Sequence, residues 1–246
     1  MMLNYAKSIS IFLILQLGIC FSSEISALEI LEKSIRSLDG VDHSISLDIT
    51  TSKKGDDPKT KELNLSVHWS ADKNIYKMMH LEEGSNGSKG RELLIHEHND
   101  ASMKTWIKYP KSGKVKEVKD KKLSKKIDVS EITTPLSLLD KKMKIVSNDT
   151  INQIACKIIE IKDGDEKIKL WIDTVDFIIH KKEHYDKKSK LYKTIEYSNL
   201  IIQDKIKFYK NIKTVYLKEK KIANLVVNEF KIRDFKDSKI FKVPKE

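Results

Sequence analysis

Histidine and carboxylate side chains at close spacing are the residues of this sequence that could bind a metal ion. His96 and His98 flank Glu97, and side chains two residues apart on a strand share one face. A metal site needs at least one further ligand, and no third ligand is evident near this pair. His180 and His184 are four residues apart among lysines. We therefore interpret these histidines as structural or surface residues and predict no metal site.

No set of residues in the sequence has the pattern of a catalytic site. The chain contains no phosphate-binding loop, no Gly-x-Ser-x-Gly and no Cys-x-x-Cys. Asp163 and Asp165 are close together, but their positions are typical of a turn. Cys156 belongs to the apolar alternation Ile154-x-Cys156-x-Ile158, which indicates a small core residue and not a nucleophile. We predict that the protein is not an enzyme and that it uses no cofactor.

The chain is rich in lysine, yet its composition is that of a folded protein. Of its 246 residues, 39% are hydrophobic and 34% are charged, with a formal net charge of +11. A basic chain can bind nucleic acid or an anionic membrane, but these lysines are interleaved with Glu and Asp. This favours a solvated surface, and we predict no nucleic-acid partner. The lysine-rich stretch Lys111–Asp128 fits an exposed strand and loop, or a patch for anionic lipid or an acidic partner.

The first 22 residues have the pattern of a signal peptide. A basic residue precedes a short apolar run over Ile9–Phe21, which is too short to cross a membrane. Small residues at the −3 and −1 positions permit cleavage after Ser22. We therefore predict a mature chain that begins near Ser23, is soluble in the periplasm and forms a single domain over residues 23–246.

A second interpretation of the N-terminus is that the mature protein is a lipoprotein. Leu17-Gly18-Ile19-Cys20 resembles the sequence at which a cysteine becomes lipidated, which would make Cys20 the first residue of the mature chain. Ile19 is bulky for the position before that cysteine, so we favour simple secretion. The membrane-anchored form remains the alternative.

Alternating hydrophobic and polar residues predict a sheet of antiparallel strands. In Lys169–Ser198, three such strands are joined by turns at Asp173–Asp176 and Asp186–Lys190. Connections of this length allow only antiparallel neighbours. The same alternation recurs elsewhere, with a flexible turn expected over Gly84–Gly90 and no helical period between residues 43 and 118. We count about eleven strands, so the predicted fold class is mainly β (α+β).

Two short segments have helical patterns. Ser26–Glu29 has the spacing of a capping box, and the apolar residues that follow predict an amphipathic helix over Ala27–Leu38. Thr134 and Pro135 are typical of an N-cap and a first helical residue. We therefore predict a second helix over Pro135–Leu139.

An open sheet of this size must curve, so its apolar face either fills with side chains or encloses a ligand cavity. Such a cavity suits acyl chains, because each buried methylene contributes about 0.8 kcal/mol. We predict that both helices lie on the concave side as a lid. The candidate wall residues are Leu65, Val67, Trp69, Ile107, Ile158 and Leu170, and the candidate lid residues are Leu31, Ile35, Leu136 and Leu139.

Several stretches, taken in order, carry a resemblance to a known family. They are Trp106–Pro110 with Gly113–Val115, Thr134–Leu139, Leu170–Asp173 through Tyr185–Lys187, and Lys193–Tyr197 through to Asp234–Val243. In this order they resemble the LolA-like family of outer-membrane lipoprotein-sorting proteins, and the likeness covers most of the secreted chain. The resemblance implies an unclosed β-barrel whose helices form a lid over a hydrophobic cavity.

The resemblance also implies a function and partners. A periplasmic carrier of this kind takes the acyl chains of lipoproteins from an inner-membrane ABC transporter and delivers them to an acceptor in the outer membrane, and we expect it to act as a monomer. The family's functionally important arginine aligns with none of Arg36, Arg91 and Arg233. Two alternatives therefore stay open, namely a carrier of another lipid on the same fold, and an acceptor or structural lipoprotein tethered through Cys20.

Overall fold

The computed structural model describes residues 25–70, 72, 74–85, 88–118, 133–236 and 238–243. The expected signal peptide, its cleavage site and Cys20 lie outside the described residues. The later part of the lysine-rich stretch Lys111–Asp128 lies outside them as well.

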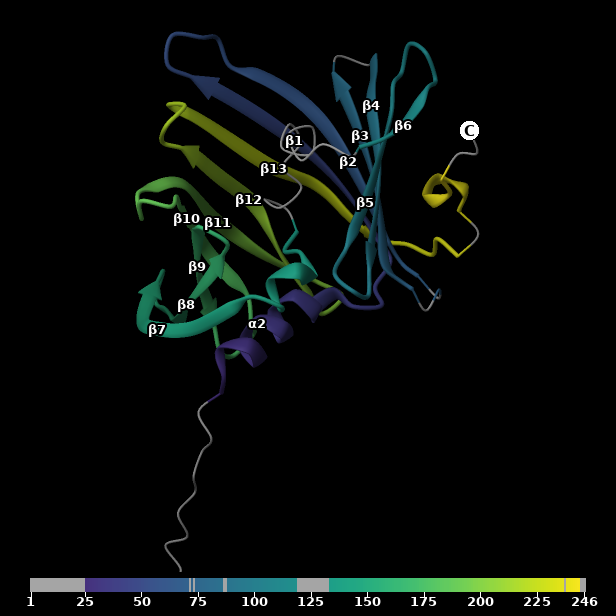
Figure 1. Cartoon of the computed structure of the whole chain (residues 1–246). Coiled ribbons are helices and arrows are strands. Elements are labelled where there is room, and N and C mark those ends of the chain that lie inside the picture. Colours follow the sequence, from purple (N-terminus) through teal and green to yellow (C-terminus); the bar gives the residue numbers. More distant parts are fainter. Residues whose placement is uncertain are drawn as a thin grey trace, which may run out of the picture.

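In the described residues, thirteen antiparallel strands form one continuous sheet (Figure 1). The first series runs outward from the centre of the sheet: β1 (His43–Lys53), β2 (Lys59–Trp69), β3 (Ile75–Ser85), β4 (Ser88–His98), β5 (Met103–Lys108) and β6 (Val115–Glu117). The second series runs from the opposite edge back to the centre: β7 (Lys142–Ile151), β8 (Ile154–Asp163), β9 (Glu166–Asp173), β10 (Ile179–Tyr185), β11 (Leu191–Gln203), β12 (Ile206–Tyr216) and β13 (Lys221–Ile232). The predicted mainly β class is confirmed, with thirteen strands in place of about eleven.

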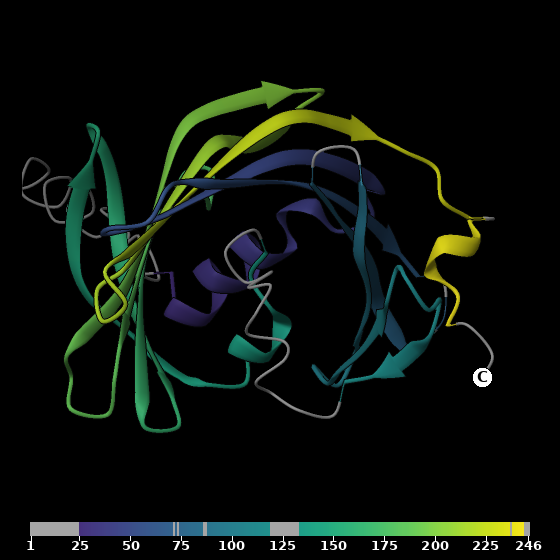
Figure 2. The same cartoon turned by 90° about the horizontal axis from the view of Figure 1, so that it is seen from above.

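The two series meet where β1 pairs with β13, over His43–Lys53 and Lys221–Ile232. This pairing joins strands that are far apart in sequence, whereas the pairs within each series are neighbours along the chain. The edges of the sheet are β6 and β7, and they do not pair with each other in the described residues. The sheet is therefore strongly curved but unclosed, as the family resemblance implied (Figure 2).

The N-terminal helix lies on the concave side of the sheet (Figure 2). It consists of α2 (Ala27–Ile35) and a 3-10 turn, η1 (Arg36–Leu38), so the predicted bounds are confirmed. The hydroxyl of Ser26 accepts the backbone N–H of Glu29 at 3.1 Å, as a capping residue does. Gly40 then takes a left-handed φ of +77°, which a glycine adopts without strain and which lets the chain turn into β1.

The second helix also lies on the concave side, but its cap differs from the prediction. It is a single 3-10 turn, η3 (Leu136–Leu138), and Pro135 precedes it in an extended conformation with ψ of 147°. Thr134 does not cap this turn: its hydroxyl instead accepts a hydrogen bond from Lys182 at 3.0 Å. The backbone N–H of Leu136 donates to the carboxylate of Glu97 at 2.7 Å. The capping acceptor is therefore supplied by a distant strand.

The turn predicted over Gly84–Gly90 is narrower than expected, and residues 86 and 87 within it lie outside the described residues. Gly84 belongs to β3 and Gly90 to β4, so both strands extend into this stretch. A Cβ atom on Gly90 would lie 2.5 Å from the backbone oxygen of Glu83. Glycine is needed at this position because the two backbones approach closely and leave no room for a side chain.

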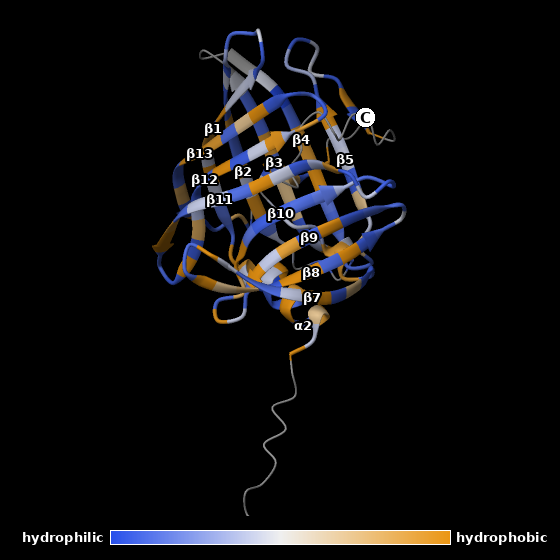
Figure 3. Ribbon diagram, turned by 90° about the vertical axis from the view of Figure 1, so that its left-hand side faces the viewer, coloured by the Kyte–Doolittle hydropathy of each residue, from blue (hydrophilic) through white to orange (hydrophobic). Residues whose placement is uncertain are grey.

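The C-terminal segment folds back against the outer face of the sheet. It contains a 3-10 turn, η4 (Lys239–Phe241), and Phe241 is buried. His96 on β4 bonds the backbone oxygen of Phe241 at 3.0 Å. Along the strands themselves, hydrophobic and hydrophilic residues alternate, which is the pattern expected when the two faces of a sheet differ in environment (Figure 3).

Candidate functional site

Two apolar clusters line the concave face of the sheet. The larger one, the wall cluster, is formed by strands on both sides of the β1–β13 junction: Leu47, Leu63, Leu65, Val67, Met79, Leu81, Leu93, Ile95, Ile107, Ile195, Ile212, Ala223, Leu225 and Val227. The second, the lid cluster, joins the two helices to β8 and β9: Ile30, Leu31, Ile35, Leu136, Leu138, Ile159, Ile161, Leu170 and Ile172. Together they make up the apolar part of the interior of the sheet, and the helices belong to the lid cluster.

Most of the predicted wall and lid residues lie in these two clusters. Leu65, Val67 and Ile107 belong to the wall cluster. The lid cluster contains the predicted residues Leu31, Ile35, Leu136 and Leu170, with Leu139 partly buried against it. The helix leucines are therefore buried against the strands.

Two predicted wall residues have other surroundings. Ile158 packs with Cys156 and Trp171 in a small cluster of its own. Because side chains alternate along β8, Ile158 lies on the opposite face from Ile159 and Ile161, and it does not line the interior. Because Ile158 and Ile159 are adjacent, the sequence does not indicate which of the two points to the interior. Trp69 is partly buried, and its indole N–H donates to the backbone oxygen of Val41 at 3.0 Å.

A buried ion pair lies on the same concave face as the apolar clusters. Lys77 on β3 and Glu97 on β4 are paired in register. Their ammonium and carboxylate groups are 2.9 Å apart, with side chains only 7% and 1% exposed. The ammonium group of Lys77 is also 5.6 Å from the ring centres of Trp69 and Tyr76. Charged groups in such a site are stable only when they are paired and hydrogen-bonded.

Glu97 connects this ion pair to the lid. One carboxylate oxygen pairs with Lys77, and the other accepts the N–H of Leu136 at the start of η3. Hydrogen bonds to a charged acceptor are stronger than those between neutral groups. A second lysine, Lys182 on β10, holds the same segment through Thr134. The lid is therefore attached to the strands by polar contacts as well as by its leucines.

Sequence reasoning missed these interior polar residues, although strand alternation carried the signal. Glu97 continues the inward positions Leu93 and Ile95, and Lys182 is paired in register with Leu170 and Ile195. In the sequence, Glu97 stands out only as the middle residue of a His-Glu-His pattern. The structure places His96 and His98 in contact with the backbone of Phe241 and Asn74 respectively, in agreement with their structural interpretation.

An aspartate, a histidine and a tyrosine form a second buried network near Cys156. Asp173 accepts backbone N–H groups of its own turn and lies 2.9 Å from the imidazole of His180. The hydroxyl of Tyr209 is 2.7 Å from the other ring nitrogen of His180. Burial alone would raise the pKa of Asp173, but these hydrogen bonds hold it below its usual value. The carboxylate therefore stabilises the predicted turn at Asp173–Asp176.

The thiol of Cys156 is not activated by this network. Burial raises its pKa to about 11, with a further contribution from the nearby charge of Asp173. A thiol with a raised pKa is protonated at neutral pH and is a poor nucleophile. The arrangement fits the predicted role of Cys156 as a small buried residue.

The unclosed sheet with helices on its concave side defines a LolA-like fold, and comparison with known proteins agrees. A family model described as an uncharacterized protein matches residues 77–245. The protein belongs to the family of this model. No match to a curated protein was found from the sequence. Within the described residues, no helix has both the length and the hydrophobicity required to span a bilayer.

Solved structures with the same fold include three from different bacteria. A DUF1329 family protein from Desulfovibrio piger is 14% identical with a TM-score of 0.74, over 87% of this chain and 95% of that one. A putative outer membrane lipoprotein-sorting protein domain from Vibrio parahaemolyticus is 15% identical with a TM-score of 0.68, over 87% and 95%. A LolA superfamily protein from Nitrosomonas europaea is 18% identical with a TM-score of 0.67, over 89% and 98%. These similarities establish the fold.

Proposed function

We propose that the protein is a periplasmic carrier that binds the acyl chains of lipoproteins on its concave face and delivers them to the outer membrane. The observation that carries this proposal is the apolar interior of an unclosed sheet, on which two short helices are packed through Leu31, Ile35 and Leu136. The lipoprotein-sorting domain from Vibrio parahaemolyticus has the same fold. An inner-membrane transporter and an outer-membrane acceptor are the partners that such a carrier requires.

In this proposal the lid and the lipid compete for the same apolar wall. In the closed arrangement the leucines of the lid cover Ile159, Ile161 and Leu170. An acyl chain that enters must displace them, and each fully buried leucine contributes about 1.5–3 kcal/mol to closure. The apparent affinity for lipid is therefore the affinity of the open form multiplied by the fraction of molecules that are open. A variant with a weaker lid should take up lipid more readily.

The test is uptake of a fluorescent fatty acid by the wild type and by Leu136→Asp. Leu136 is 6% exposed in the lid cluster, so a charge at this position opposes closure. We expect Leu136→Asp to take up the probe faster and to bind it several-fold more tightly. Leu28→Asp is the matched control, because Leu28 is on α2 but is 47% exposed. We expect this control to behave like the wild type.

Circular dichroism distinguishes an open lid from an unfolded protein, and Leu139→Asp is a second, partly buried lid variant if Leu136→Asp does not fold. A purified lipoprotein in place of the fatty acid separates the lipoprotein carrier from a carrier of another lipid. The proposal is wrong if the folded wild type binds neither ligand and the lid variants also bind none.

An acceptor or structural lipoprotein anchored through Cys20 is the alternative assignment. Mass spectrometry of the mature N-terminus distinguishes the two, because a carrier begins near Ser23 without lipid and a tethered protein begins at a lipidated cysteine.

A further inference from the structure

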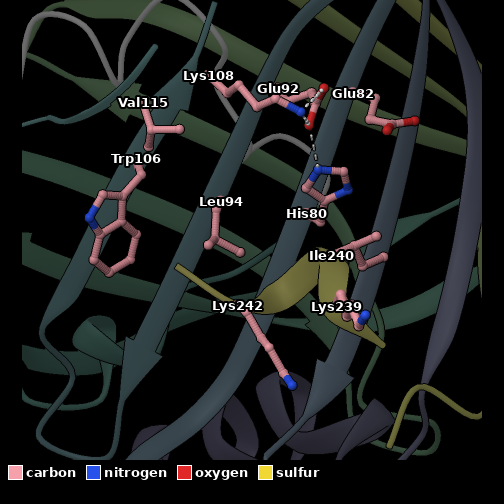
Figure 4. Close-up of a pocket in the computed structure, with 10 residues that line it drawn as sticks. All are labelled: His80, Glu82, Glu92, Leu94, Trp106, Lys108, Val115, Lys239, Ile240 and Lys242. Atoms are coloured by element: carbon pink, nitrogen blue, oxygen red, sulfur yellow. Dashed lines mark hydrogen bonds and ion pairs between the residues drawn. The ribbon is translucent and has the colours of Figure 1, made fainter. Parts of the chain in front are cut away.

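A pocket on the outer face of the sheet lies beneath the C-terminal segment, away from the apolar interior. Its volume is about 350 Å³, and its walls are formed by β3, β4, β5 and the residues around η4. Three potential metal ligands, His80, Glu82 and Glu92, lie together here: the ring of His80 is directed at the carboxylate of Glu92, and Glu82 lies beside them (Figure 4). This site lies on the opposite face of the sheet from the wall cluster, because His80 alternates with Leu81 along β3.

The strand register places two acidic residues directly opposite each other. His80 and Glu82 are two residues apart on β3, and Glu82 is paired with Glu92 on β4. Like charges in directly opposed cross-strand positions destabilise a sheet. On the far side of Glu92, Lys108 donates two hydrogen bonds to it at 2.9 and 3.0 Å. Among the described residues, no cation forms an ion pair with Glu82, so its repulsion with Glu92 is only partly offset.

The distances between the ligand atoms suit a small divalent ion. The ring nitrogen Nε2 of His80 is 3.4 Å from Oε2 of Glu92. Two ligand atoms on a tetrahedral ion with bonds of about 2.1 Å lie about 3.4 Å apart. All three ligand atoms are within 4.8 Å of one another, and Glu82 is exposed, so a small rotation of its side chain completes the set. His80 is 7% exposed and holds its ring in a fixed place.

We propose that His80, Glu82 and Glu92 bind a divalent transition-metal ion such as Zn²⁺, with the fourth coordination position open to the pocket. One imidazole and two carboxylates suit first-row divalent ions, and three protein ligands leave a position for water or for an oxygen atom of a bound molecule. The ion would also neutralise the opposed carboxylates of β3 and β4.

Lys108 competes with a metal ion for the carboxylate of Glu92. Its side chain is 45% exposed, so it can move into solvent when the ion binds Glu92. Lys239 and Lys242 also line the pocket and lower the affinity for any cation. Removal of Lys108 therefore has the opposite effect from removal of a ligand.

The experiment measures Zn²⁺ binding to untagged, chelator-treated protein by calorimetry, with Co²⁺ absorption as a report of the ligand set. We expect one ion per chain in the wild type. Mutation of a residue that only hydrogen-bonds a metal ligand weakens metal binding by about 10–100-fold. Glu82→Gln removes a ligand itself, so it should weaken binding by about 100-fold or more. Lys108→Ala should tighten it several-fold. Glu229→Gln, at an exposed carboxylate on β13 that pairs with Lys231, should leave it unchanged.

Thermal unfolding gives a second readout that does not depend on the binding signal. An ion that binds only the folded state raises its stability, so Zn²⁺ should raise the melting temperature of the wild type and not that of Glu82→Gln. Glu82 is exposed, and this variant is expected to fold. The proposal is overturned if the wild type binds no stoichiometric ion, or if Glu82→Gln binds Zn²⁺ as the wild type does.

Discussion

Glu97 is the residue at which the interior of the sheet and its lid are connected. Its carboxylate pairs with Lys77 on the neighbouring strand and accepts the N–H of Leu136 from the lid. Both interactions are almost completely shielded from solvent. Loss of this one side chain therefore leaves a buried ammonium group and a backbone N–H without their acceptor, and each of these groups is costly to bury alone.

We predict that Glu97→Ala lowers the free energy of unfolding by about 3–5 kcal/mol, the usual loss when one partner of a buried ion pair is removed. The double variant Lys77→Met with Glu97→Leu removes both charges and should lose less than the single variant. Urea denaturation of the three proteins measures these differences. Equal losses in the single and double variants would contradict the role assigned to the ion pair.

The sequence was sufficient to predict hydrogen bonds between residues close together in the chain, but not contacts between residues on different strands. The turn at Asp173 was recognised because its hydrogen bonds are local. The cap of Leu136 was assigned to Thr134, its neighbour but one, whereas the actual acceptor is on β4. The cluster of His80, Glu82 and Glu92 went unnoticed, and no metal site was predicted, because its ligands come together only through the register of β3 and β4.

At the scale of elements, strand alternation and turn residues were sufficient to predict most of the strands and the N-terminal helix. The turn between β3 and β4 was predicted too wide, because Gly84 and Gly90 belong to the strands themselves. In the structure, the absence of a side chain at Gly90 lets its backbone lie against Glu83. A glycine in a sequence does not distinguish a mobile turn from a close contact between strands.

We predict that Gly90→Ala destabilises the protein by about 1–3 kcal/mol, the typical cost of forcing an extra group into a packed site. The added methyl group would lie 2.5 Å from a backbone atom, which cannot move as a side chain can. Gly55→Ala is a useful comparison, because its added methyl group meets nothing within 4 Å and only its φ of +92° opposes the change. Thermal denaturation ranks the two variants, and a Gly90→Ala protein as stable as the wild type would contradict the close approach.

At the scale of the whole molecule, the fold consists of two series of antiparallel strands that meet at β1 and β13. The sequence predicted the curvature and the concave position of the helices, since a large sheet with one apolar face must curl around it. It could not predict the meeting of β1 with β13, because that pairing joins strands from opposite ends of the chain. The result is a curved sheet whose edge strands β6 and β7 do not pair with each other in the described residues, with the helices packed on its concave side.

The central claim is that this interior holds acyl chains, and the most direct measurement is lipid extraction from the purified, natively folded protein followed by mass spectrometry. We predict that acyl lipids are recovered with the wild type in a defined ratio, and that an added lipoprotein displaces them. Recovery of no lipid, together with no uptake of added fatty acid or lipoprotein by the wild type or the lid variants, would contradict the claim and would show that the leucines of the lid only complete a solid core.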